Sequence, residues 1–207
     1  MLPSDNHEHV DDAPRSMRYE DVRERRKAML REPHMEVLTT YVERLQDRQI
    51  GFVPWFDPLD GGVNAKALFL MEKPGPMTAE PNGSSFISRN NDDPTAEAMF
   101  LFMRQAGIDK RLTVTWNVIP AWNGTIAING KELNRGVDCV GDLMTLLPEI
   151  RVIVFVGRKA ATAMPLVKPL GIAMIESYHP SPIVRASRRD EWDAIPNQWK
   201  KILPYLG

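Results

Sequence analysis

The chain has 207 residues, of which 26% are charged and 43% hydrophobic, and its formal net charge is −1 at pH 7. This composition is typical of one folded domain with a sizeable core, and no apolar run approaches the roughly 18 residues that a membrane-spanning helix needs. The balanced charge argues against an extended surface for nucleic acid, although it leaves room for a small one. The N-terminus lacks the features of a secretory signal, so we expect a cytoplasmic protein, without a membrane segment and monomeric.

The single cysteine, Cys139, limits the chemistry that the chain can carry. One thiol cannot form an intramolecular disulfide, a thiolate zinc site or an iron–sulfur cluster, since each of these needs several sulfur atoms. We therefore expect no metal and no other cofactor, and we interpret Cys139 as a packing residue.

Composition along the chain predicts three parts. Residues 1–15 are polar and contain too few apolar side chains to offset the entropy of ordering, so they are expected to form a disordered tail. Residues 16–50 show helical spacing that is broken at Pro33, which predicts two helices packed on the domain. Residues 51–207 form the predicted α/β domain.

The first strand of this domain is predicted over residues 67–71, after a loop over residues 51–62 that is rich in Pro, Gly and Asp. The run is too short for a buried helix, and Pro74 and Gly75 prevent a helix from continuing it. The later elements are a loop (78–93), a helix (94–106), a strand (112–119), a helix (130–147), a strand (151–157), a helix (160–167), a strand (172–175) and a helix (192–205). This alternation predicts a three-layer α/β/α fold with a central four-stranded, mainly parallel sheet.

Polar side chains follow three of the predicted strands at the point where each strand ends. Glu72 and Lys73 follow the first strand, Asn117 lies near the end of the second, and His179 follows the fourth. Each has an ordinary structural interpretation, such as a solvated ion pair, a turn amide or a loop histidine. Because the carboxyl ends of parallel strands meet at one edge of the sheet, their joint occurrence favours a functional site.

These strand ends carry motifs that resemble those of the uracil-DNA glycosylase superfamily, from about residue 53 to residue 183. Residues 71–76, Met-Glu-Lys-Pro-Gly-Pro, are similar to its first motif, and residues 83–86, Gly-Ser-Ser-Phe, to its base-stacking segment. Asn117 corresponds to a strand asparagine that reads the pyrimidine, and residues 156–161 to a strand–helix junction. Residues 179–182 reproduce the His-Pro-Ser-Pro signature, which is the most specific match.

The resemblance implies a uracil-DNA glycosylase-like fold and a hydrolase that removes uracil or another deaminated base from DNA. By this resemblance His179 would donate to the base, and Asn117 would select uracil over cytosine through its amide. Phe86 would stack on the base, and Ile183 would fill the gap that a flipped base leaves. The implied site comprises catalytic Glu72 and His179, base-binding Lys73, Phe86 and Asn117, and DNA-binding Pro180, Ser181, Pro182, Ile183 and Arg185.

Lys73 departs from the superfamily pattern, because relatives carry Asp, Asn or Ala at this position. An ammonium lacks the acceptor that would orient a water molecule. We therefore assign water positioning or cation stabilisation to Glu72, with Glu80 as the second candidate. Three interpretations of Lys73 remain open: it pairs with Glu72, it binds a phosphate, or it marks a loss of activity.

Three functions are compatible with the sequence. The leading hypothesis is a DNA glycosylase of base excision repair. The second is a non-catalytic uracil-DNA binder in which Lys73 impairs water activation. The third is a hydrolase of free nucleosides or nucleotides, which the arginines after residue 182 disfavour because they suit a polymer.

Overall fold

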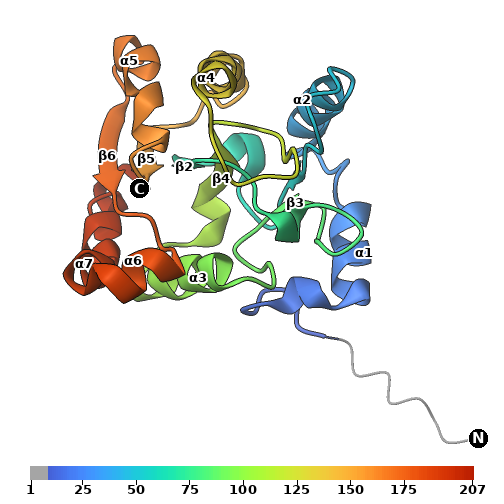
Figure 1. Ribbon diagram of the computed structural model, residues 1–207, viewed down its shortest axis with the longest axis horizontal. Helices are drawn as coiled ribbons and strands as arrows, with labels where there is room; N and C mark the ends of the chain where they lie inside the picture. Colours follow the sequence, from blue (N-terminus) through green and yellow to red (C-terminus); the bar gives the residue numbers. More distant parts are fainter. Residues whose placement is uncertain (1–8) are drawn as a thin grey trace, which may run out of the picture.

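A computed structural model describes residues 9–207 and contains a sheet of four parallel strands in the order β4-β2-β5-β6 (Figure 1). The strands are β2 (Ala67–Met71), β4 (Thr113–Asn117), β5 (Val152–Val156) and β6 (Ala173–Ser177). Every residue of β4 and β5 is buried, as expected for a parallel sheet that is covered on both faces. The structure confirms the predicted α/β class and its central parallel sheet.

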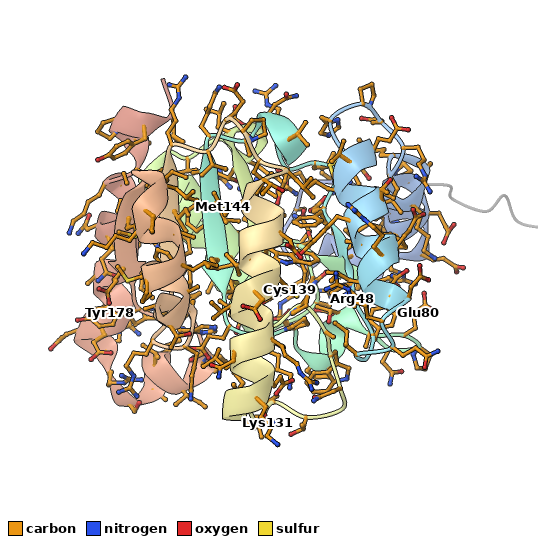
Figure 2. All side chains as sticks on the ribbon, turned by 90° about the horizontal axis from the view of Figure 1, so that it is seen from above. Arg48, Glu80, Lys131, Cys139, Met144 and Tyr178 are labelled. Atoms are coloured by element: carbon orange, nitrogen blue, oxygen red, sulfur yellow. The ribbon has the colours of Figure 1, made fainter. Side chains whose placement is uncertain are left out.

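Helices cover both faces of this sheet (Figure 1). On one face lie α4 (Gly130–Met144) and α5 (Met164–Val167), and on the other lie α3 (Pro94–Ala106) and α7 (Arg189–Lys200). Side chains alternate along β2, so that Leu68 and Leu70 face the first layer while Phe69 faces the second. Figure 2 shows α4 in front of the sheet, with the labelled Lys131 near its start and Met144 at its end.

The helix after residue 93 begins and ends as its sequence predicts. The Asp93 side chain accepts hydrogen bonds from the backbone N–H groups of Thr95 and Ala96, and Pro94 occupies the first turn. Gly107 closes the helix with a φ of 73°. Residues 160–167 instead form the short 3₁₀ helix η5 (Ala160–Ala163) followed by α5, and a further helix, α6 (Pro182–Ser187), precedes α7.

The N-terminal helices α1 (Glu20–Ala28) and α2 (Glu36–Gln46) pack against this domain. Leu38, Val42 and other apolar residues of α2 belong to the same buried cluster as β4 and α4. The Tyr41 hydroxyl donates to the backbone oxygen of Cys139 at 2.8 Å, which joins α2 to α4. The remaining 3₁₀ helices are η1 (Ser16–Arg18), η2 (Gly62–Asn64), η3 (Pro76–Thr78), η4 (Lys110–Leu112), η6 (Lys168–Leu170) and η7 (Leu203–Tyr205).

Two short strands occur where the sequence predicts only loops. β1 (Trp55–Phe56) and β3 (Phe86–Ile87) pair in parallel as a separate two-stranded sheet. Strands of two residues are too short to leave a periodic pattern in the sequence, so the predicted loops over 51–62 and 78–93 did not include them.

The segment before α1 is attached to the domain over the part that the structure describes. Residues 1–8 of the predicted tail lie outside the described residues. In residues 9–15, Asp12 accepts hydrogen bonds from Arg89 and Asn90, and Arg15 donates to Glu97. Along residues 9–207 we find no helix that is both long enough and apolar enough to cross a membrane.

Candidate functional site

The polar strand ends of the sheet lie side by side at one edge. Because all four strands are parallel, the strand order places Asn117 on β4, Glu72 after β2, Gly157 after β5 and His179 after β6 along the same edge. Met71 is in register with Asn117, and the backbone pairing continues beyond it, since Ile119 donates its N–H to the oxygen of Glu72 at 3.0 Å. The sheet therefore brings three predicted site residues to one edge.

Glu72 and His179 meet at Gly157. A Cβ atom placed on Gly157 would lie 2.7 Å from Glu72 Oε1 and 3.2 Å from His179 Cδ2, so both side chains contact the same backbone segment. Lys159, at the start of η5, donates its backbone N–H to Glu72 Oε1 at 3.1 Å. The carboxylate is thus held beside the imidazole by the strand–helix junction after β5.

His179 is half-buried and lies beside one negative charge. Burial lowers the pKa of His179 below its usual value, although the Glu72 carboxylate acts in the opposite direction. The imidazole is therefore neutral at pH 7 and carries one N–H donor and one acceptor nitrogen. Within residues 9–207 the structure shows no hydrogen bond to the imidazole ring, so its donor is available to a ligand.

Asn117 is a mostly buried residue whose amide has no hydrogen-bond partner in the described part of the chain. Its side chain belongs to a residue that is 4% exposed, and no group in the described part of the chain is hydrogen-bonded to the amide. Buried polar groups are nearly always paired with protein atoms, water or a ligand. The two donors and the acceptor of this amide are therefore free to bind a ligand or water at the sheet edge.

Lys73 points away from Glu72. Its ammonium forms an ion pair with Glu132 Oε1 at 2.7 Å and donates to Asn123 Oδ1 at 2.8 Å and to the backbone oxygen of Ala127 at 3.1 Å. The side chain is 3% exposed. Of the three interpretations of Lys73, the structure contradicts the pairing with Glu72, because Glu132 of α4 neutralises the Lys73 ammonium.

The structure does not bring Phe86 to the sheet edge as an accessible ring. Phe86 is 0% exposed and packs in a separate cluster with Met17 and Val22. The pairing of β3 with β1 carries this residue under the N-terminal helix. Glu80, the second candidate for water positioning, accepts a hydrogen bond from the Ser85 hydroxyl at 2.8 Å.

The residues after His179 form a capped helix start. The Ser181 hydroxyl accepts from the backbone N–H of Val184, and Pro182 occupies the first turn of α6. Ile183, in the first turn of α6, is 73% exposed. An exposed large apolar side chain of this kind is a candidate for contact with a binding partner. Arg185 lies over the Trp192 ring at 5.7 Å.

The arginines that follow are engaged with neighbouring carboxylates. Arg188 pairs with Glu191 at 3.0 Å, and Arg189 pairs with Asp193 at 2.9 Å. Both pairs lie three or four residues apart, which is the ordinary spacing of solvated helix pairs. Arg185 is thus the arginine of α6 and α7 that is best placed to meet a phosphate.

A cavity of about 510 Å³ lies at the amino end of β4, whereas the candidate site lies at the carboxyl ends of the strands. Three of its cations are matched by internal carboxylates: Arg89 by Asp12, Lys110 by Asp57 and Arg111 by Asp109. Arg104, the fourth cation that lines the cavity, has no ion pair in the described part of the chain. In the described residues, no group of three or more His, Cys, Asp or Glu side chains is arranged to hold a metal ion.

Comparison with solved structures gives likeness at the level of the fold. No protein-family profile and no curated protein matches this chain. A Methanosarcina acetivorans protein, described from its solution NMR structure as "a putative Uracil DNA glycosylase", is similar to it with 20% sequence identity and a TM-score of 0.49. The match covers 70% of this chain and 93% of that one.

One contributor to the site escaped prediction from the sequence. The sequence places Gly157 only within a strand–helix junction over residues 156–161, whereas the structure has both Glu72 and His179 against it. A glycine directly after the buried Val-Ile-Val-Phe-Val strand was the available signal, because glycine at a strand end often marks a close approach of another group.

Proposed function

We propose that this protein is a DNA glycosylase that hydrolyses the N-glycosidic bond of uracil, or of another deaminated base, in DNA. The observation that carries the proposal is the amide of the mostly buried Asn117, which has no hydrogen-bond partner within residues 9–207, on the same sheet edge as the neighbouring Glu72 and His179. A pyrimidine edge with alternating donors and acceptors is the kind of ligand that such an amide recognises. The motif resemblance of residues 71–76 and 179–182 supports the same conclusion.

The chemistry requires charge stabilisation on both sides of the breaking bond. When the bond between C1′ and the base nitrogen breaks, its electron pair leaves with the base and the sugar becomes a cation that water then attacks. Neutral His179 donates a hydrogen bond to the base oxygen where negative charge develops. Glu72 stabilises the sugar cation, orients the water and accepts its proton.

Asn117 supplies the choice of base in this proposal. Its amide oxygen accepts from N3–H of uracil and its amide nitrogen donates to O4, whereas cytosine presents the opposite pattern. Mispairing leaves buried polar groups unsatisfied, which is how such sites discriminate strongly. We assign no stacking role to Phe86, since a base would reach it only after Phe86 lost its contacts with Met17 and Val22.

DNA is proposed to lie over the start of α6. The turn formed by Pro180, Ser181 and Pro182 would approach the phosphate backbone, and the exposed Ile183 would enter the base stack. Arg185 would contact a flanking phosphate. Lys73, with three partners of its own, leaves no free ammonium for the base and is proposed to hold the loop after Asn117 in place.

The test is cleavage of an oligonucleotide that contains a single uracil, given both single-stranded and paired. The wild-type protein is expected to produce abasic sites, and His179→Ala and Asn117→Ala to reduce the rate by about 100-fold or more. Asn134→Ala is the matched control, because Asn134 is exposed on α4 and its side chain has no hydrogen bond in the described part of the chain. Absence of abasic product from the wild-type protein would contradict the catalytic proposal.

A non-catalytic uracil-DNA binder is the second candidate, and the lysine at position 73 favours it. If Lys73 blocks water activation, the wild-type protein will bind uracil-containing DNA without cleaving it, and Lys73→Ala will restore cleavage. The ion pair of Lys73 with Glu132 leads us to expect the opposite result, namely that Lys73→Ala loses stability and gains no activity. A mobility-shift assay and the cleavage assay on the same samples separate the two outcomes.

A further inference from the structure

We propose that Gly157 is a positioning residue for the candidate site. The absence of a side chain at this position allows the Glu72 carboxylate and the His179 imidazole to lie next to each other at the sheet edge. The catalytic meaning of this inference rests on the proposed glycosylase function. Its structural content, the coupling of two side chains through a third position, can be tested without activity.

A side chain at position 157 would displace the Glu72 carboxylate. A Cβ atom on Gly157 would lie 2.7 Å from Glu72 Oε1, 3.3 Å from Glu72 Cδ and 3.2 Å from His179 Cδ2. Cβ atoms essentially never approach another heavy atom below 3.0 Å, so Glu72 would have to move. We infer that this movement separates the carboxylate from the imidazole.

The backbone around Gly157 cannot yield instead. Gly157 donates its N–H to the oxygen of Ser177 at 2.9 Å, which extends the pairing of β5 with β6. Its own oxygen accepts from Ala161 at 3.3 Å, at the start of the following helical segment. Lys159 holds Glu72 Oε1 from the same junction. The glycine is therefore fixed on both sides, and the side chains must absorb the displacement.

The substitution Gly157→Ala also strains the backbone, and the experiment needs controls that separate this strain from the contact with Glu72. Gly157 has a φ of +91°, which side-chain-bearing residues rarely adopt, so Gly157→Ala introduces strain as well as a contact. Gly124 has a φ of +86° and Gly171 a φ of +69°, and a Cβ atom on either would have no neighbour within 4 Å. Gly124→Ala and Gly171→Ala are thus matched controls that carry the strain without the contact.

The decisive measurement is the NMR titration of His179 in a double-mutant cycle of Gly157→Ala and Glu72→Gln, with His179→Gln to assign the resonance. In the wild-type background Glu72→Gln is expected to lower the pKa of His179, because a neighbouring carboxylate favours the imidazolium. In the Gly157→Ala background the same change is expected to shift this pKa by less than half as much. In Gly124→Ala and Gly171→Ala the full shift should persist.

An equal shift in the Gly157→Ala and wild-type backgrounds overturns the inference. Should Gly157→Ala fail to fold, Gly157→Ala/Glu72→Ala replaces it, because removal of the carboxylate relieves the close contact. Recovery of a cooperative melt in this double variant supports the inference, while failure of both variants attributes the effect to the backbone and overturns it.

Activity provides a second readout if the wild-type protein cleaves uracil-containing DNA. A misplaced pair of catalytic groups is expected to lower kcat by about 10- to 100-fold with little change in KM, since binding of the base through Asn117 is retained. If the wild-type protein does not cleave, the proposed function fails, whereas the titration still decides the role of Gly157.

Discussion

Asp57 and Asp60 are three residues apart and both buried, yet their surroundings shift their pKa values in opposite directions. Burial would raise the pKa of Asp57, but ion pairs with Lys110 at 2.7 Å and with Arg26 at 2.9 Å outweigh it and lower the pKa. Burial raises the pKa of Asp60 to about 7, and the Asp57 charge adds to this effect, although Lys110, at 3.9 Å, acts in the opposite direction. The distance of each carboxyl from the neighbouring cations thus decides which of the two has the lower pKa.

We predict that Asp60→Asn changes stability in a pH-dependent way. A carboxyl whose pKa is raised by folding contributes stability that is fully present below its unfolded value and is lost as the pH rises through the folded value. At pH 8 the variant should therefore be more stable than wild type by roughly 1 to 3 kcal/mol, and near pH 4 this gain should disappear. Denaturant unfolding at several pH values measures it. The control is Asp109→Asn, at a carboxyl whose pKa Arg111 lowers, and it should show no gain in stability at pH 8. A gain in stability for Asp60→Asn that is equal at all pH values would refute the prediction.

The helix α4 links the candidate site to the core of the sheet. Its first turn is capped by Asn129 and supplies Glu132, the partner of Lys73. One turn later Gly136 lies against the chain that leaves β4, where a Cβ atom would be 2.5 Å from the backbone oxygen of Val118. This close approach holds α4 against the segment that directly follows Asn117.

We predict that Gly136→Ala destabilises the protein by about 1 to 3 kcal/mol, because overpacking against backbone outweighs the gain of about 1 kcal/mol that alanine brings to a helix interior. Gly141→Ala on the same helix is the control, since its Cβ atom would make an ordinary 3.4 Å contact with Leu166. Thermal and denaturant melts of the two variants should differ in sign. A stabilised Gly136→Ala would show that α4 can move away from β4 without cost.

Element by element, the sequence anticipated most of the architecture. The buried strands β2, β4 and β5 are short apolar or β-branched runs bounded by turn residues, and α3 is delimited by Asp93 and Gly107. The short strands β1 and β3 were not anticipated, because two-residue strands exist only through their pairing partner. Local signals predict elements whose formation depends on their own residues.

On the scale of the whole molecule, a buried ionic cluster joins the N-terminal helices to the domain. Asp57 connects Arg26 of α1 with Lys110 of η4 and also accepts a hydrogen bond from Ser88. Arg26 and Asp57 are 0% exposed. Charges buried to this degree are tolerated only when each has its partner.

We predict that Asp57→Asn lowers the free energy of unfolding at pH 7 by about 3 to 5 kcal/mol, because two buried cations lose their counter-ion. The loss should shrink as the pH falls below about 4, where the unfolded wild-type carboxyl becomes protonated and the contribution of its lowered pKa is lost. Asp92→Asn, at an ion pair with Arg15 that is about one third exposed, should cost less than about 1 kcal/mol. Equal effects of the two substitutions would show that the cluster does not hold the N-terminal helices.

The fold class and the edge where the candidate site lies follow from short-range patterns, because alternating strands and helices admit few topologies and parallel strands end at one edge. Glu72, Asn117 and His179 could therefore be assigned to that edge before any coordinates were known. The partner of Lys73, the burial of Phe86 under Met17 and Val22, and the meeting of Glu72 with His179 at Gly157 could not. Each of these contacts joins residues from distant parts of the chain, and such contacts depend on how whole layers pack rather than on neighbours in the chain.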